Sequence, residues 1–361
     1  MILKIFILWR LGLLILSFWA LMAIQKESVD VLALFSLEKD SKYVQSQIQW
    51  DGGHYLSIAK FGYLNSSDFA FFPLYPLIIK SLTAVAGNEI FWGLLASNLS
   101  FFLFLVILNK FLTAKYSKKI AFNVFVTYLF FPSAFFATVY YSESLFLLLV
   151  SLFWYSMKKK QYLLGAVFIS LASLTRVIGS FLIISFFYNY FSRAKSSRSF
   201  SNKNIIYPFL SAAGIVIYMA YLFVSVGNPF EFHSAQALWG RQVTDPITVI
   251  ISYAWSYLIE PKPLIDYLDY SLSLLFLIIL ILGRNKIQSS LWIFSMLTIL
   301  IPISTGTFTG MPRYLLSSIG AFIIIGKYLE EKPFLKKPVW ATSLALQIIL
   351  YIRFLNGFWV A

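Results

Sequence analysis

The stretch IFILWRLGLLILSFWALMAI, residues 5–24, decides the class of fold, because Arg10 is the only charged residue in this apolar run. A helix needs about 20 such residues to cross the hydrocarbon core of a bilayer. The run is too long for the apolar part of a cleaved signal peptide, and it lacks an exit of the A-x-A type. We therefore expect it to be retained as a first membrane span.

The composition of the whole chain agrees with this first run. Of its 361 residues, 59% are hydrophobic and 12% are charged, and the mean hydropathy is +0.77. Soluble domains carry about 25% charged residues. The sequence therefore predicts an all-α, polytopic membrane protein with room for about a dozen crossings, which excludes a large soluble catalytic domain.

Composition also limits cofactors and partners. The absence of cysteine excludes disulfides, thiol nucleophiles and cysteine-ligated metals, and two histidines are too few for a histidine-rich metal site. The net charge is +14, but the basic residues are dispersed in short loops, whereas nucleic-acid binding needs a clustered basic surface. We expect no cofactor and no nucleic-acid partner, and the composition does not indicate a metal.

Eleven apolar runs are predicted to form spans. They are residues 5–24, 90–112, 120–139, 143–157, 162–175, 177–191, 205–226, 270–283, 289–305, 314–328 and 339–355. Short loops rich in lysine and arginine should lie on the cytoplasmic side. With the N-terminus inside, that side collects 18 of the 29 lysines and arginines, and the outer side collects 13 of the 15 carboxylates. This charge distribution supports the predicted topology.

Two further apolar segments make poor crossings. Residues 71–86 contain two prolines and Lys80, and residues 247–259 lie between two prolines. We interpret both as helices in the outer membrane interface. The single domain, residues 1–361, then has a large first outer loop at residues 25–89 and a second at residues 227–269. These two loops hold most of the polar chemistry.

A first polar cluster is QWDGGHYLSIAKFGY, residues 49–63, in the first outer loop. Asp51 follows Trp50, and the two glycines after it allow a bend that can bring Asp51 and His54 to one place. The alternative is an aromatic anchor at the interface with an aspartate that caps a helix.

Two more carboxylates lie on the predicted outer side. Asp68 begins the stretch DFAFFPLYP, residues 68–76, and Glu143 lies in YYSESLF, residues 140–146. Each is a candidate for substrate binding. Each also has a structural alternative, since a carboxylate at a helix N-terminus is stabilised by capping and by the helix dipole.

Three arginines come to the outer side from separate segments: Arg176 in LTRVIG, Arg241 in GNPFEFHSAQALWGR and Arg313 in GMPRYLL. Arginine is suited to bidentate recognition of phosphate. The alternative is that each arginine reaches lipid headgroups or pairs with an outer carboxylate. The same motifs add further candidate binding residues, namely Glu231, His233, Gln236 and Tyr314.

From Gln49 to Leu316 these motifs occur in an order that resembles the PIG-V family, the mannosyltransferases of glycolipid-anchor assembly and their prokaryotic relatives. The series runs WDGGHY, FGY, AFFPLYP, YYSESLF, SLTR, GNPFEFHSAQALWGR and MPRYLL. The family belongs to the GT-C class of membrane glycosyltransferases. The resemblance implies a GT-C-like fold.

The resemblance also implies an activity, the transfer of a sugar, in that family mannose, from a polyprenyl-phosphate donor to a glycolipid, glycan or protein acceptor at the outer face, with inversion. Asp51 matches the position of the catalytic base. It stands alone, without the paired acidic motif of some GT-C enzymes, so a metal is not indicated. The arginines would neutralise the departing phosphate, His54 would orient Asp51 or bind a sugar hydroxyl, and Trp50 and Tyr314 would stack on sugar or isoprene.

Two other functions compete with this one. A transporter or flippase for a glycolipid or a polyprenyl-phosphate sugar would explain the spans and arginines, but it usually needs ionisable groups near the bilayer midplane. A structural subunit of a membrane complex predicts no convergent polar site. The expected location is a cell membrane with the site on the extracytoplasmic side, or the endoplasmic reticulum membrane in a eukaryote.

Overall fold

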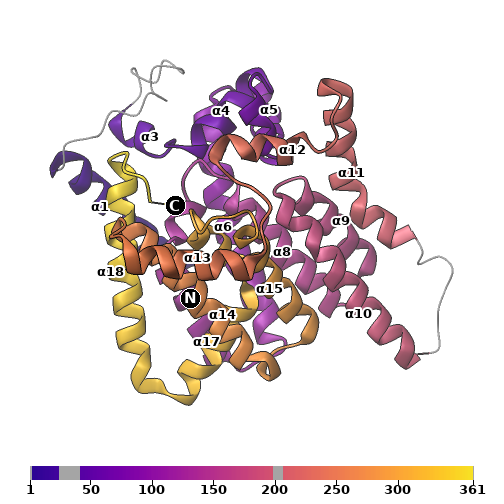
Figure 1. Ribbon diagram of the computed structural model, residues 1–361. Coiled ribbons are helices and arrows are strands. Elements are labelled where there is room, and N and C mark those ends of the chain that lie inside the picture. Colours follow the sequence, from indigo (N-terminus) through magenta and orange to yellow (C-terminus); the bar gives the residue numbers. More distant parts are fainter. Residues whose placement is uncertain (1, 24–40, 198–205, 361) are drawn as a thin grey trace.

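The computed structural model describes residues 2–23, 41–197 and 206–360 (Figure 1). Within these ranges 80% of the structure is helical and there are no strands. The prediction of an all-α protein is confirmed. Residues 25–40 of the predicted first outer loop lie outside the described residues.

Each of the eleven predicted runs overlaps an α-helix. These helices are α1 (Ile2–Ala23), α6 (Glu89–Thr113), α7 (Lys118–Phe130), α8 (Glu143–Lys158), α9 (Tyr162–Ser173), α10 (Leu182–Ser197), α11 (Ile206–Val226), α14 (Leu264–Leu282), α15 (Ser289–Ile303), α17 (Ile319–Glu331) and α18 (Lys336–Leu355). The two segments predicted to lie in the interface form α5 (Leu74–Ala86) and α13 (Pro246–Ile259).

Shorter helices connect these elements. They are α3 (Lys42–Ser46), α4 (Asp51–Phe61), α12 (Glu231–Ser234), α16 (Met311–Leu315) and the 3₁₀ turns η2 (Ser66–Ala70), η3 (Ala134–Ala137), η4 (Val177–Phe181), η6 (Ala235–Trp239), η7 (Arg284–Lys286) and η8 (Pro333–Leu335). The tenth predicted span is therefore divided, because α16 and α17 are separate helices.

Five helical segments of the described chain are long and apolar enough to cross a membrane: Ile2–Met22, Glu89–Thr113, Ile206–Val226, Leu264–Leu282 and Pro333–Leu355. The other helices among the predicted spans have 12 to 16 residues. At about 1.5 Å per residue they reach roughly 18 to 24 Å, less than the hydrocarbon core of about 30 Å. The protein is a membrane protein, and the number of eleven crossings stays a prediction.

The third predicted span shows why the boundaries differ. Its α-helix α7 ends at Phe130, not at residue 139, because Pro132 follows and cannot donate to a helical hydrogen bond. The buried Gln347 of α18 donates from Nε2 to the carbonyls of Leu129 and Phe131 at 2.9 and 2.7 Å. The same side chain accepts from Trp9 Nε1 of α1 at 3.0 Å. Gln347 thereby satisfies the backbone where α7 ends and joins three helices.

One end of the bundle is formed by helices of the predicted first outer loop. In Figure 1, α1 and α18 lie at one side, α9, α10 and α11 lie at the other, and α4 and α5 lie together at the end of the bundle. Helix α8 packs between α6 and α9. Helix α13 runs across the view in Figure 1 and packs against α15. The N-termini of α4 and α8 and the turn that contains α16 meet at this end.

Candidate active site

Asp51 is the first residue of α4 and lies at the positive end of that helix. The preceding Trp50 has a φ of 53°, an uncommon conformation for a side-chain-bearing residue, and its ring packs edge-to-face on Trp359 at 4.9 Å. Gly52, after Asp51, packs closely on the backbone, since a Cβ there would lie 3.3 Å from the Tyr140 carbonyl oxygen. The sequence WDG therefore brings the start of α4 close to the backbone before α8.

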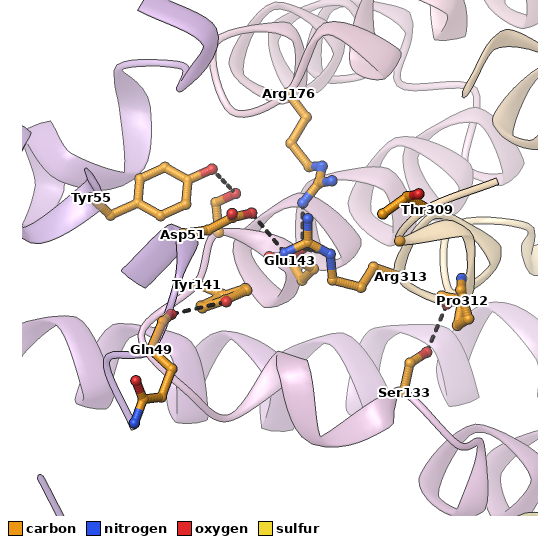
Figure 2. A network of polar contacts seen from close by, with 12 residues as sticks. Gln49, Asp51, Tyr55, Ser133, Tyr141, Glu143, Arg176, Thr309, Pro312 and Arg313 are labelled. Carbon is orange, nitrogen blue, oxygen red and sulfur yellow. Dashed lines mark hydrogen bonds and ion pairs between the residues drawn. The ribbon is translucent and has the colours of Figure 1, made fainter. Parts of the chain in front are cut away.

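Arg313 of α16 bridges two carboxylates (Figure 2). Its Nη1 donates to Asp51 Oδ2 at 2.6 Å, and its Nε lies 3.7 Å from Glu143 Oε1. The guanidinium also lies 5.3 Å from the ring centre of Tyr141 and 5.5 Å from that of Phe136. These contacts use the planar, forked shape of arginine as well as its charge.

Glu143, the first residue of α8, is shared with a second arginine. Arg176 Nη1, from the turn before η4, lies 2.6 Å from Glu143 Oε1. The Arg176 guanidinium lies 5.2 Å from the ring centre of Tyr314. The result is a row of alternating charges, Asp51–Arg313–Glu143–Arg176, drawn together in Figure 2. We call this row the charge row.

The members of the charge row differ in exposure. The side chains of Glu143 and Arg313 are 3% and 8% exposed, that of Arg176 is 15% exposed, and that of Asp51 is 25% exposed. Asp51 is therefore the most exposed carboxylate of the row, whereas Glu143 is enclosed between its two arginines. This distribution assigns Glu143 to holding the arginines and leaves Asp51 as the accessible acid of the row.

The electrostatics keep Asp51 ionised. Burial raises the pKa of Asp51, but the charge and hydrogen bond of Arg313, together with the charges of His54 and Arg176, outweigh burial and hold this pKa below its usual value of 3.8. Arg313 and Arg176 are thus paired with carboxylates, as the alternative interpretation of the sequence held.

In the hydrogen bonds recorded for the described chain, His54 pairs with Asp68 and not with Asp51. Its Nδ1 lies 2.9 Å from Oδ1 of Asp68, a side chain that is 1% exposed. Asp68 Oδ2 accepts from the backbone amides of Leu64 and Asn65 at 3.2 and 3.0 Å, and Asp68 caps η2. Asp68 therefore caps η2 and not the following interfacial helix α5, whose N-cap is Pro73. His54 is held by Asp68, and its role beside Asp51 stays a prediction.

Aromatic side chains flank His54. Its ring is stacked on Phe71 at 4.5 Å, with an interplanar angle of 15°, and lies edge-to-face with Trp239 of η6 at 6.0 Å. His54 is 33% exposed and Trp239 is 45% exposed. The segments predicted to be the first and second outer loops therefore meet at His54 and Trp239.

Arg241 contacts neither carboxylate of the charge row in the hydrogen bonds recorded for the described chain. Its Nη1 donates to Thr305 Oγ1 at 3.0 Å and its Nη2 donates to the Thr309 carbonyl at 3.1 Å. The adjoining amide of Gly310 donates to Asp269 Oδ2 at 2.9 Å. Arg241 thus holds the loop that precedes Arg313.

Three other sequence candidates are not joined to the charge row by any hydrogen bond or ion pair recorded for residues 41–197 and 206–360. Glu231 Oε2 accepts from Asn228 Nδ2 at 2.9 Å within its own turn. His233 is exposed and Gln236 is half-buried. Their roles in substrate binding stay predictions.

Sequence reasoning missed several residues that build the site. Tyr55 and Ser142 share a hydrogen bond of 2.6 Å between α4 and the start of α8, and Tyr141 donates to the Gln49 carbonyl at 3.0 Å (Figure 2). Tyr141 and Ser142 lie in the motif from which only Glu143 was chosen, so their proximity to it was the available signal. No comparable indication exists in the sequence for Asp269, because its hydrogen-bond partner is the backbone amide of Gly310, which no side-chain pattern can reveal.

The chemistry of the donor set does not favour a resident metal. Within the described ranges there is no group of three or more histidine, aspartate or glutamate side chains that could hold a metal ion. The carboxylates of the charge row are already neutralised by arginines. Metal independence remains a prediction.

Comparison with known proteins follows this geometry. A family model described as Mannosyltransferase (PIG-V) matches residues 2–230. The chain belongs to the PIG-V mannosyltransferase family. Membership of the PIG-V family implies a membrane glycosyltransferase that transfers mannose from a sugar donor to an acceptor. No curated protein and no solved structure matches the chain.

The matched region divides the site. Asp51, Glu143 and Arg176 lie within residues 2–230 of the PIG-V match, whereas Arg241 and Arg313 lie after it. The charge row therefore joins a segment that carries the family signature to a segment that does not.

Proposed function

We propose that the protein transfers mannose from a polyprenyl-phosphate mannose to a hydroxyl group of a glycan, lipid or protein, at the extracytoplasmic face of a cell membrane and with inversion at the sugar carbon. We also assign it to the GT-C class. The observation that carries the proposal is the charge row, in which the most exposed carboxylate, Asp51, is paired with the buried Arg313. Family membership supports mannose as the sugar.

In this mechanism Asp51 is the general base. It accepts the proton of the acceptor hydroxyl as that oxygen forms a bond to C1 of the sugar, on the face opposite the phosphate. The bond between C1 and the phosphate oxygen breaks, and its electron pair stays on the phosphate. A sugar phosphate already has a stabilised leaving group, so one carboxylate is enough. The low pKa of Asp51 keeps it ionised before the reaction.

The charges of the site suit such a donor. Asp51, Glu143, Arg313 and Arg176 sum to zero, and Arg241 adds one positive charge to the neighbourhood of Tyr314. A phosphodiester donor carries one negative charge. When Asp51 takes the proton, its attraction for Arg313 falls at the moment when the second negative charge develops on the departing phosphate. Arg313 can then stabilise that phosphate.

The polar groups favour a transferase over a transporter. Asp51 and Glu143 begin α4 and α8, and Arg176 lies just after the end of α9. All three are therefore at helix ends that the predicted topology puts on one side of the membrane. A transporter would need ionisable groups along a path through the bilayer.

The test is transfer in proteoliposomes that contain the purified protein, polyprenyl-phosphate [³H]mannose and a panel of glycolipid, glycan and peptide acceptors. We expect labelled product from wild type and a loss of about a hundredfold or more in Asp51→Asn, because the amide keeps the shape but removes the base. Asp245→Asn is the matched control, since Asp245 is an exposed aspartate that caps α13. Movement of donor across the bilayer without product, or full turnover by Asp51→Asn, would contradict the proposal.

A further inference from the structure

The peptide group between Thr309 and Gly310 is held at both of its polar atoms. Its carbonyl oxygen accepts from Arg241 Nη2 at 3.1 Å, and its amide donates to Asp269 Oδ2 at 2.9 Å. The two side chains come from different parts of the chain, the loop after η6 and the helix α14. We call these two contacts the peptide clamp.

The clamped peptide sets the start of the helix that carries Arg313. Gly310 is the N-cap of α16 and has a φ of 78°, a conformation that favours glycine. The Arg313 amide donates to the Gly310 carbonyl at 3.2 Å. On the other side, Ser133 Oγ donates to the Pro312 carbonyl at 2.7 Å (Figure 2). The backbone around Arg313 is thus fixed by contacts that do not involve its side chain.

Asp269 is an unusual residue for a purely structural contact. Its side chain is 1% exposed, and its second oxygen, Oδ1, has no hydrogen-bond partner in the described part of the chain. A buried carboxylate with one free oxygen is costly to keep. Its recorded side-chain hydrogen bond leads to Gly310, three residues before Arg313.

We propose that Asp269 is a positioning residue that fixes the Gly310 amide, and through it the start of α16, so that Arg313 reaches both Asp51 and Glu143. This inference rests on the proposed function for its kinetic test. It assigns the role to the hydrogen bond at Asp269 Oδ2, not to the charge of the carboxylate. Arg241 supports the same peptide from its carbonyl side.

Two variants separate the hydrogen bond from the charge. Asp269→Asn keeps an acceptor oxygen for the Gly310 amide, and Asp269→Leu has a similar shape without an acceptor. Asn123→Leu is the matched control: Asn123 is also 1% exposed, and it donates to the Gly326 carbonyl at 3.1 Å, between α7 and α17. If Asp269→Leu does not accumulate, Asp269→Ala removes the same acceptor with a smaller side chain.

The kinetic readout is the pH profile of mannose transfer. In Asp269→Leu we expect kcat to fall roughly tenfold and the acid limb of kcat/KM to move to higher pH, because a displaced Arg313 no longer holds down the pKa of Asp51. Asp269→Asn should keep the wild-type profile, and Asn123→Leu should lose stability without moving the limb. An unmoved limb in Asp269→Leu, or a limb moved equally by Asp269→Asn, would overturn the proposal.

A second readout does not need activity. The melting temperature in detergent is compared for Asp51→Asn alone, Asp269→Leu alone and the pair, because only coupled residues give non-additive effects. We expect Asp51→Asn to lower it in the wild-type background and to have little effect once Asp269→Leu has displaced Arg313. Additive effects would refute the positioning role even if transfer is found. Coupling without any transfer would uphold it and refute the proposed function instead.

Discussion

Arg313 offers the sharpest test of the charge row, because it contacts two carboxylates through different nitrogens. In Arg313→Ala, Asp51 loses its donor and Glu143 retains Arg176 alone. Breaking a buried pair by removing one partner costs about 3 to 5 kcal/mol. Asp51 is 25% exposed, so water compensates part of this loss. We expect the free energy of unfolding to fall by about 3 kcal/mol.

Arg313→Lys should lie between alanine and wild type. A lysine ammonium can reach one carboxylate but cannot span both, and it does not reproduce the stacking on Tyr141 and Phe136. Losing one charge-assisted hydrogen bond costs about 1.5 kcal/mol. Transfer at limiting donor should fall about tenfold in the lysine variant and about thirtyfold or more in the alanine variant, since each 1.4 kcal/mol is a factor of ten.

The assay combines denaturant titration in mixed micelles, followed by tryptophan fluorescence, with transfer at saturating and limiting donor. Arg284→Lys is the control, because Arg284 lies over the Trp292 ring at 4.8 Å and donates to Ser289 without an ion pair recorded in the described chain. Wild-type kinetics in Arg313→Lys, with only a small loss of stability in Arg313→Ala, would refute the bridging role. That pattern is expected of an arginine that reaches only to lipid headgroups.

Two further predictions concern the charge row, and a third concerns the membrane topology. Transfer should persist as the pH falls towards 4, because Arg313 holds the pKa of Asp51 below 3.8. The stability from this pair is present above the unfolded pKa of about 3.9 and is lost as the pH falls through the lower folded pKa. In Arg313→Gln the acid limb of kcat/KM should move to higher pH, and an unmoved limb would count against Asp51 as the base. Glu143→Gln should lower the free energy of unfolding by about 3 kcal/mol, because Arg313 and Arg176 lose their shared carboxylate. The denaturant titration described for Arg313 measures this change. A change under about 0.5 kcal/mol, typical of surface sites, would contradict the prediction. Single cysteines introduced into this cysteine-free chain should test the topology with a membrane-impermeant thiol reagent in intact cells. Cysteines at the exposed positions Asn65 and Ser234 should react, and cysteines at the exposed positions Ser117 and Asn285 should not. Labelling at Ser117 and Asn285 would invert the predicted topology.

The composition and the apolar runs were enough to predict a helical membrane protein, because a run of about twenty apolar residues is typical of a membrane-spanning helix. They were not enough to place helix ends. Pro132 interrupts the third run, and Gln347, more than 200 residues later, supplies the donors that make this break tolerable. A break of this kind depends on a partner in another helix, so local pattern alone cannot locate it.

The members of the site were easier to predict than their pairing. Asp51, Glu143, Arg176 and Arg313 were all chosen because charges near a membrane are costly and invite explanation. Which carboxylate each arginine meets depends on how α8 and α16 pack, which the sequence does not state. His54 was placed beside Asp51 by proximity in sequence, whereas the turn at η2 brings Asp68 to it instead.

The length of chain between Asp51 and Arg313 also has a consequence for biosynthesis. The two residues are 262 positions apart, and ribosomes add about 5 to 20 residues per second. Asp51 is therefore made roughly 13 to 50 s before its partner. Glu143 meets Arg176 early, since both emerge in the first half of the chain. The nascent protein therefore enters the membrane before Asp51 has its partner, and the site becomes electrically balanced only when the segment that carries Arg313 is inserted.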